Sequence, residues 1–383
     1  MSGQAQYDVI ILGAGPAGLS TALHLLRHDP RWSERILVLE KAVHPRFKLC
    51  GGAVTRLGLR VLQSLGFSLP LPLEQFYIKE VYLQYQDQTV TLHGKPQLVI
   101  FERAVLDAYL AKEAENRGIQ IRQGETVQQL EFRPHEVILV SSQNVYRAQV
   151  IVGADGANGI TRRWMRRLMP KARIARTIEF IQPATPTLSH FKQKAALFDF
   201  SLLRLGLQGY VWDFPFFSHG KVALNRGIYD ARLDRSKPSL ALPKLLSTAF
   251  RSPEPPDTPS LQGHPIHWFS PRNRFSAPRL LLVGDAAGVD PLFGEGIGPA
   301  LAYGQLAAQS IVEAFARQDF SFAHYRSRLK HSYLGRYLMT RWITAEVCYR
   351  MTGHDWFPAM IWRLGRELAR LFPDPEPLFS PQD

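Results

Sequence analysis

The spacing of apolar residues changes along the chain, and each change predicts a different kind of element. Wholly apolar runs at 9–12, 150–152 and 280–283 are typical of strands buried on both faces of a parallel sheet. The first and last runs are followed by turns and then by apolar residues at helical spacing. Residues 78–94 instead alternate between apolar and polar side chains, which favours strands of an antiparallel sheet. The pattern therefore predicts a chain with two kinds of sheet.

The turn after the first apolar run carries three glycines with G-x-G-x-x-G spacing, at Gly13, Gly15 and Gly18. Strand, glycine turn and helix in this order form a dinucleotide-binding unit, because the backbone can approach a pyrophosphate at the helix N-terminus. The next apolar run ends at Glu40, 22 residues beyond Gly18, where a carboxylate typically binds ribose hydroxyls. An acid at this place argues against a 2′-phosphate, so this segment predicts FAD or NAD.

Two later strand ends carry aspartates that narrow the choice of cofactor. The run at 150–152 leads into the turn Asp155-Gly156. The run at 280–283 leads into Gly284-Asp285, after which Pro291, Gly294 and Gly296 precede an alanine-rich helix. Asp285 could accept hydrogen bonds from a sugar-like chain, and the helix would direct its N-terminal amides at whatever lies before it.

These motifs together resemble the FAD-dependent oxidoreductases related to para-hydroxybenzoate hydroxylase, in family order over residues 5 to 315. The resemblance implies FAD as cofactor, Asp285 as the ligand of its ribityl chain, and an arginine, Arg103, that reaches toward it. Related proteins usually have a serine where this chain has Gly159. The FAD contacts that the resemblance implies are Gly13, Ala14, Gly15, Pro16, Ala17, Gly18, Glu40, Lys41, Cys50, Gly51, Gly52, Arg103, Val127, Asp155, Gly156, Gly284, Asp285, Pro291, Gly294, Gly296 and Ile297.

Two further stretches, "FKLCGGAVT" at 47–55 and "GYVWDFPFFSHGKVALNRGIYD" at 209–230, resemble the geranylgeranyl reductase branch of this group. That branch reduces isolated C=C bonds of prenyl chains. The resemblance implies Cys50 and Tyr210 as catalytic residues, and a substrate site at Tyr210, Trp212, Phe214 and Pro215. Packing alone remains an alternative for Cys50, because cysteine is also a common small buried residue.

A monooxygenase, meaning a hydroxylase or epoxidase, or a halogenase on the same fold is the alternative function. Halogenases carry W-x-W-x-I-P where this chain has "YVWDFP", so the first tryptophan and the isoleucine are absent. Lys79 is a lysine of the kind that a halogenase would need nearby, but one lysine on an alternating strand is close to chance. A flavoprotein that only binds and shields a lipid is a third hypothesis.

The length of 383 residues suits two domains rather than one core. We expect an α/β protein, α+β overall, with a Rossmann-like FAD-binding domain interleaved with an antiparallel-sheet substrate domain. The predicted FAD-binding domain takes residues 5–70, 98–170 and 275–320, and the substrate domain takes 71–97 and 171–274. Residues 321–383 have a helical pattern in which aromatic side chains and methionines are interspersed with arginines.

The chain is basic, with 46 Lys and Arg against 33 Asp and Glu and a net charge of +13. The sequence contains no nucleic-acid recognition module, so we expect no nucleic acid, and we expect no metal. The expected partners are a hydrophobic small molecule, NADPH or a ferredoxin as reductant, and a membrane face that the basic C-terminal helices could contact. Two cysteines indicate a reducing compartment, and we expect a cytoplasmic protein, with peripheral membrane contact as one possibility.

Overall fold

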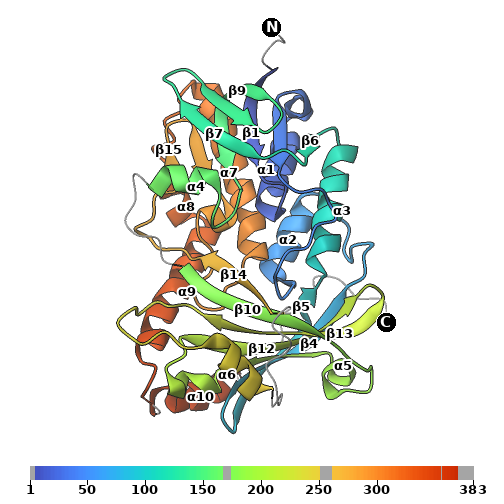
Figure 1. The fold of residues 1–383 in the computed structure, drawn as a ribbon, viewed down its shortest axis with the longest axis vertical. Helices are drawn as coiled ribbons and strands as arrows, with labels where there is room; N and C mark the ends of the chain where they lie inside the picture. Colours follow the sequence, from blue (N-terminus) through green and yellow to red (C-terminus); the bar gives the residue numbers. More distant parts are fainter. Residues whose placement is uncertain (1–4, 167–173, 251–260, 355, 370–383) are drawn as a thin grey trace.

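The computed structural model describes residues 5–166, 174–250, 261–354 and 356–369. Two sheets lie one above the other along the longest axis of the molecule, and helices cover the upper sheet and close the lower end (Figure 1). The helices are α1 (Pro16–His28), α2 (Arg56–Ser64), α3 (Arg103–Asn116), α4 (Ile160–Met165), α5 (Ser189–Gln193), α6 (Leu242–Ala249), α7 (Ile297–Arg317), α8 (Tyr325–His331), α9 (Tyr333–Arg350) and α10 (Trp356–Ala369).

The upper sheet has the strand order β15-β16-β9-β1-β2-β6, and β8 and β7 continue from β9. Strand β1 pairs in parallel with β2 and with β9, which puts the apolar run 9–12 at the centre of the sheet with at most 2% exposure. The strands are β1 (Ala5–Leu12), β2 (Ile36–Glu40), β6 (Gln120–Gln123), β7 (Val127–Phe132), β8 (Val137–Ser141), β9 (Val145–Gly153), β15 (Ser276–Ala277) and β16 (Leu280–Leu282). The parallel core predicted from the apolar runs is confirmed.

The lower sheet has the order β14-β10-β13-β12-β11-β4-β5-β3, with one parallel pair, β11 and β4, among antiparallel neighbours. The alternating stretch 78–94 forms parts of β4 and β5, which are joined by a turn at residues 86–87. The strands are β3 (Ala53–Thr55), β4 (Phe76–Tyr85), β5 (Gln88–Ile100), β10 (Ile174–Pro183), β11 (Ala195–Asp199), β12 (Gly209–Ser218), β13 (Lys221–Asp230) and β14 (Gln262–His267).

The chain passes between the two sheets several times, as an interleaved arrangement requires (Figure 1). Residues 53–55 and 98–100, which the sequence assigned to the FAD-binding domain, pair within the lower sheet. We retain the two-domain division as a proposal. The boundary predicted between residues 170 and 171 lies outside the described residues, which leave out 167–173, and so do residues 251–260 of the predicted substrate domain.

The C-terminal segment is helical over α8, α9 and α10, and its last residues, 370–383, lie outside the described part. Helix α10 packs against the lower sheet, where the Trp362 Nε1–H donates a hydrogen bond of 2.7 Å to the Leu83 carbonyl of β4. Within the described residues, every helix is too short or too polar to cross a bilayer.

Candidate cofactor and substrate site

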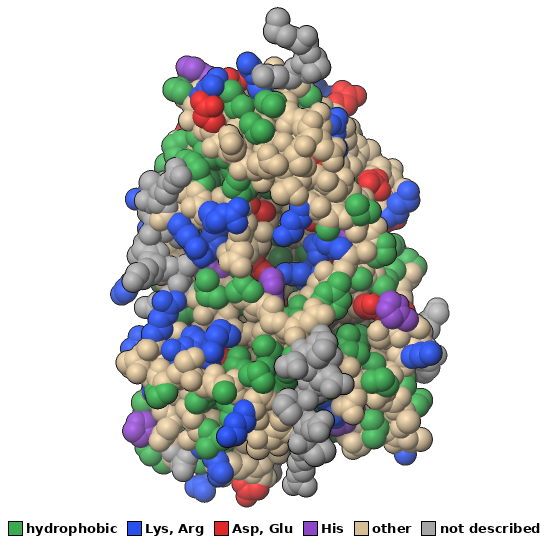
Figure 2. Space-filling model, in the orientation of Figure 1, with side chains coloured by type: hydrophobic (Ala, Val, Ile, Leu, Met, Phe, Trp, Pro, Cys, Tyr) green, Lys and Arg blue, Asp and Glu red, His purple; other side chains and the backbone are tan. Residues whose placement is uncertain are grey.

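A cavity of about 1260 Å³ lies between the two sheets and takes its lining from both. Figure 2 shows the hollow from outside, with Lys and Arg side chains gathered around it. The residues predicted from the sequence that line it are Gly13, Gly15, Pro16, Ala17, Glu40, Lys41, Cys50, Gly51, Gly52, Arg103, Val127, Asp155, Gly156, Tyr210, Trp212, Phe214, Gly284, Asp285, Gly294, Gly296 and Ile297.

Four residues of the predicted site are not part of this lining. The Ala14 N–H donates to Glu40, and Gly18 lies beneath the turn, where a Cβ would come 2.0 Å from the Gly13 carbonyl oxygen. The Pro291 carbonyl accepts a hydrogen bond from the Tyr229 hydroxyl, and Pro215 is a β12 residue paired with Leu224. These contacts are made to neighbouring residues of the fold, and the part that the four residues take in binding FAD or substrate stays a prediction.

The glycine turn between β1 and α1 has a conformation that only glycine tolerates at its first position. Gly13 has φ +109°, and a Cβ there would lie 2.4 Å from the Ala154 carbonyl oxygen. Glu40, at the end of β2, accepts hydrogen bonds from the Ala14 N–H at 2.9 Å and the Ala42 N–H at 3.1 Å. Its carboxylate therefore stabilises the turn itself and also faces the cavity.

Arg103 begins α3 and is fixed by a buried carboxylate one turn along the helix. Its Nε and Nη2 donate to the two oxygens of Asp107 at 3.0 and 2.8 Å, and Arg46 lies 3.4 Å from the same carboxylate. Burial alone would lower the pKa of Arg103, but Asp107, together with Cys50, outweighs it and raises that pKa above its ordinary value. A permanently charged guanidinium is thus oriented in the cavity wall.

Asp155 lies against Gly159, the position where this chain departs from the family pattern. Its carboxylate accepts hydrogen bonds from the Thr161 backbone N–H at 3.0 Å and from the Thr161 hydroxyl. A Cβ on Gly159 would lie 2.0 Å from the Asp155 carboxyl carbon. The aspartate thus occupies the space that a serine side chain would need, and it fixes the start of α4.

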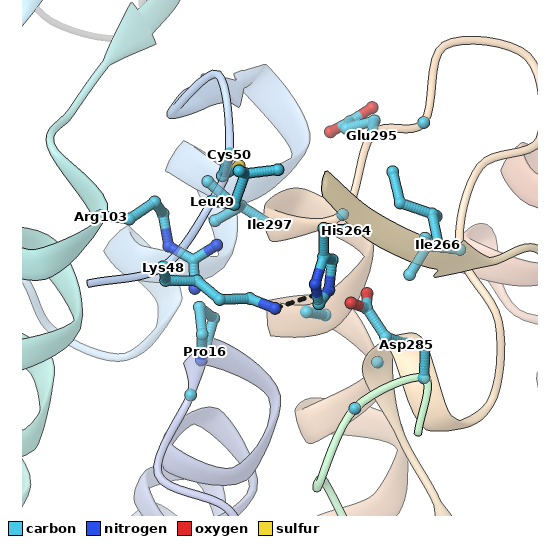
Figure 3. A pocket seen from close by; sticks show the side chains of 18 of the residues that line it. Pro16, Lys48, Leu49, Cys50, Arg103, His264, Ile266, Asp285, Glu295 and Ile297 are labelled. Carbon is cyan, nitrogen blue, oxygen red and sulfur yellow. Dashed lines mark hydrogen bonds between the residues drawn. The ribbon is translucent and has the colours of Figure 1, made fainter. Parts of the chain in front are cut away.

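Asp285 follows β16 in a short 3-10 turn and lies opposite an unexpected pair of basic residues (Figure 3). The Nζ of Lys48 lies 2.7 Å from the Nε2 of His264 on β14. Burial, with help from Lys48, lowers the pKa of His264 to about 4, so the imidazole is neutral at pH 7 and accepts the hydrogen bond. Burial also lowers the pKa of Lys48, and Asp285 opposes that shift.

The Cys-Gly-Gly segment passes between the upper sheet and the aromatic face of the lower one. Gly52 has φ +73°, and a Cβ there would lie 2.1 Å from the Phe101 carbonyl oxygen. A Cβ on Gly51 would lie 3.1 Å from the ring of Phe214. The two glycines are thus needed for close approach, and they bring the half-buried Cys50 to the cavity wall.

Tyr210, Trp212 and Phe214 lie on one face of β12, with exposures of 4–5%. The Trp212 Nε1–H donates to the Asn225 Oδ1 at 2.7 Å. A Cβ on Gly227 would lie 2.2 Å from the Trp212 ring, so the missing side chain allows the indole to extend across β13. The Tyr210 hydroxyl donates to the Phe293 carbonyl, which makes this tyrosine part of an aromatic wall.

Reasoning from the sequence missed four cavity-lining residues, namely Lys48, Glu179, His264 and Glu295, and also Asn225, which accepts the hydrogen bond from Trp212. The available signal was weak: on β10, Glu179 shares the buried face of the strand with Ala175 and Thr177. Among the described residues, no group of three His, Cys, Asp or Glu side chains is placed to hold a metal ion.

Comparisons with known proteins bear on the family and the fold. The family model "FAD binding domain" matches residues 6–181. An uncharacterized protein of Methanosarcina barkeri is 26% identical over 88% of this chain and 84% of its own. A digeranylgeranylglycerophospholipid reductase of Methanococcus vannielii is 23% identical over 86% and 84%.

Solved structures share the whole fold at low identity. A geranylgeranyl bacteriochlorophyll reductase-like protein of Thermoplasma acidophilum has a TM-score of 0.75 at 18% identity and covers 96% of this chain and 91% of its own. The halogenase PltM, solved with phloroglucinol and FAD, has a TM-score of 0.63 at 16% identity and covers 94% and 85%.

The fold and the matching family model define the class: the chain is an FAD-binding oxidoreductase, and FAD is its cofactor. The resemblance to the geranylgeranyl reductase branch seen in the sequence agrees with these findings. A geranylgeranyl bacteriochlorophyll reductase-like protein shares the fold, and a digeranylgeranylglycerophospholipid reductase and a geranylgeranyl diphosphate reductase are among the curated relatives, at 23% and 26% identity.

Proposed function

We propose that this protein reduces C=C bonds of an isoprenoid or similar lipid-like substrate. One observation carries the proposal: the Cys-Gly-Gly segment and the aromatic face of β12 meet in the cavity that also contains the glycine turn. An unactivated alkene offers few polar handles, so its site must be mainly apolar. The lower part of the cavity meets that need, with lining from Leu83, Leu92, Phe198 and Phe293 besides the β12 aromatics.

The residues of the upper part fit FAD. The turn at Gly13 leaves room for a pyrophosphate before α1, Glu40 supplies a carboxylate at the end of β2, and Asp285 supplies one before α7. We propose that the cofactor lies along these groups. When bound and reduced, FAD supplies hydride. The chain's own residues orient the alkene against the aromatic wall, exclude water and supply a proton.

Cys50 keeps its place in the proposal as a residue that contacts the reacting region. Tyr210 is less suited to give up a proton than the sequence led us to expect. Burial raises the pKa of its hydroxyl well above 10, and that hydroxyl already donates to a backbone carbonyl. We therefore propose Tyr210 as a substrate contact, together with Trp212 and Phe214.

The first test uses dithionite-reduced holoenzyme with geranylgeranyl diphosphate under argon. We expect the flavin to be reoxidised as the prenyl chain gains two hydrogens for each flavin, measured by absorbance and by mass spectrometry of the product. The same protein without substrate is the control. Oxygen-dependent turnover that yields a hydroxylated, epoxidised or halogenated product would instead support the alternative function. Lys79 weakens that alternative, since it is exposed on β4 and is not among the cavity-lining residues.

For the reductant we propose NADPH or a ferredoxin, since the sequence contains a single dinucleotide unit and a basic surface could bind an acidic carrier. The two are separated by measuring flavin reduction with each donor in turn. Ferredoxin-dependent reduction should slow as salt rises, because charge attraction between surfaces is screened.

We also propose that the protein is cytoplasmic and that its helices α9 and α10 bind the surface of an anionic lipid bilayer. Trp356, Met360 and Leu364 recur every four residues along α10 and are 50–60% exposed. Ile343 and Val347 are similarly exposed on α9. Arginines lie exposed among them, at Arg336, Arg350, Arg363 and Arg366. A second copy of the chain would place arginine against arginine, so anionic lipid is the better partner.

Vesicle binding tests this surface. We expect the protein to sediment with phosphatidylglycerol vesicles and much less with phosphatidylcholine vesicles, because each basic residue near an anionic surface contributes about 1 kcal/mol. The double substitution Trp356→Ala and Leu364→Ala should lower binding. Val145→Ala, at an exposed apolar position on β9, is the matched control. Equal binding of the double variant and the parent would contradict the assignment to α10.

A further inference from the structure

The cavity wall contains a buried carboxyl group that the sequence motifs do not assign to any role. Glu179 lies on β10 between Gly227 of β13 and Gln262 of β14 and is 5% exposed. Because Gly227 has no side chain, the Trp212 ring extends across β13 toward this row of the sheet. The carboxyl group thus lines the cavity in the same transverse row of the sheet as the aromatic wall.

The two oxygens of Glu179 differ in their hydrogen bonding. Oε1 accepts a hydrogen bond of 2.9 Å from the Cys50 N–H. Oε2 is buried and has no hydrogen-bond partner among the described residues, although the Asn225 side chain lies close to the carboxyl group. An ionised carboxylate with a buried, unsatisfied oxygen is costly, whereas a protonated one carries its hydrogen on that free oxygen. The geometry therefore favours a neutral carboxylic acid with its O–H at Oε2.

The charged neighbours permit this protonation state. Burial raises the pKa of Glu179 to about 7, and the Cys50 N–H, Asn225, Arg103 and Lys48 limit the rise. Arg103 is already paired with Asp107, and Lys48 with a neutral His264. The polar and charged neighbours of Glu179, which come from loop 46–52, α3, β13 and β14, therefore do not hold it ionised. Its carboxyl group is close to half protonated at neutral pH.

Glu295, another glutamate that lines the cavity, shows the contrast. Its Oε1 accepts from the Thr55 hydroxyl at 2.6 Å, and its Oε2 accepts from the Tyr337 hydroxyl. Both oxygens are thus engaged as acceptors, which leaves neither free to carry a hydrogen toward the cavity. Of these two acids, Glu179 is the one with a free donor.

We propose that Glu179 is the acid that protonates the substrate carbon, a role that rests on the proposed alkene reduction. As hydride adds to one carbon of the C=C bond, the Oε2–H bond breaks and its proton forms a C–H bond at the other carbon. The carboxylate that remains takes a proton from water before the next turnover. Two hydrogens are thus added, the two electrons come with the hydride, and the acid is regenerated.

The first measurement needs neither substrate nor turnover. Infrared difference spectra of the parent and Glu179→Gln holoenzymes, recorded from pH 5.5 to 9, report the carboxylic C=O band. We expect a band in the parent that disappears with a midpoint near 7 and is absent from the variant. A parent without such a band overturns the proposal, whatever its activity. A band together with no alkene reduction would retain the acid and refute the proposed reaction instead.

The second measurement separates proton donation from positioning. In Glu179→Gln the amide oxygen can still accept from the Cys50 N–H, but the titrating proton is lost. We expect single-turnover reoxidation of dithionite-reduced flavin by geranylgeranyl diphosphate to slow by a factor of about 100 to 10,000. The parent rate should fall above pH 7, and the variant should lose that dependence. Near-parental rates in the variant would mean that Glu179 only positions the loop.

Glu179→Ala removes the acceptor as well as the proton, so its additional loss beyond Glu179→Gln measures the positioning role. If neither variant folds, as judged by circular dichroism and bound FAD, the parent's own pH profile decides. A flat rate between pH 5.5 and 9 would overturn the assignment.

Discussion

Replacing Asp107 by alanine is expected to lower the free energy of unfolding by about 3–5 kcal/mol, the usual cost of removing one partner of a buried ion pair. Asp107 is 0% exposed and is the carboxylate that holds both Arg103 and Arg46. Without it, two guanidinium groups would lie close together with little solvent to screen them. Urea unfolding of the parent and the variant, both in the FAD-free state, measures the difference.

Glu113→Ala on the same helix is the matched control. Glu113 also pairs with an arginine four residues away, Arg117, but the two side chains are 28% and 31% exposed. Exposed pairs of this kind contribute about 0.3–0.5 kcal/mol. A loss for Asp107→Ala as small as that for Glu113→Ala would show that water reaches the Arg103 site.

The second large effect is expected for Asp285→Ala, which should raise the dissociation constant of FAD about 10- to 150-fold. This range corresponds to about 1.5–3 kcal/mol for a hydrogen bond to a charged group. Asp285 lies before α7 and faces the cavity, where we propose that it accepts from the ribityl hydroxyls. Titration of FAD fluorescence onto the apoprotein gives the constant. Asp234→Ala, outside the cavity lining, is the control, and an unchanged constant for Asp285→Ala would place the ribityl chain elsewhere.

The parts of the fold that could be predicted from sequence are those with local signals. The apolar run 9–12, the glycines after it and Glu40 are within one strand–helix–strand unit, so spacing alone relates them. The turn at Asp285 could be predicted for the same reason, because it directly follows the apolar run 280–283. Alternation was also sufficient to predict strands over 78–94, because one face of the lower sheet is buried and the other is not.

The cavity residues that the sequence did not predict are brought together from distant parts of the chain. Cys50 and Glu179 are separated by 129 positions, and Lys48 and His264 by 216. Their proximity follows from the order β14-β10-β13-β12 in the lower sheet and from how that sheet lies against loop 46–52. Strand order and register are set by packing and hydrogen bonding across the sheet, and one sequence carries little local trace of them. The unpaired Oε2 of Glu179 therefore could not be predicted from the sequence.

The segment 46–52 contacts residues that we assign to FAD binding and residues that we assign to substrate binding. Arg46 lies within 4 Å of Glu40 and of Asp107, and Cys50 is held through its backbone by Glu179 and Asn225. If FAD binding shifts this segment and thereby changes the affinity for the substrate, thermodynamic linkage makes the factor reciprocal. A prenyl chain that binds more tightly beside FAD must retain FAD more tightly by the same ratio. The enzyme would then lose its cofactor most readily between turnovers, after product has left.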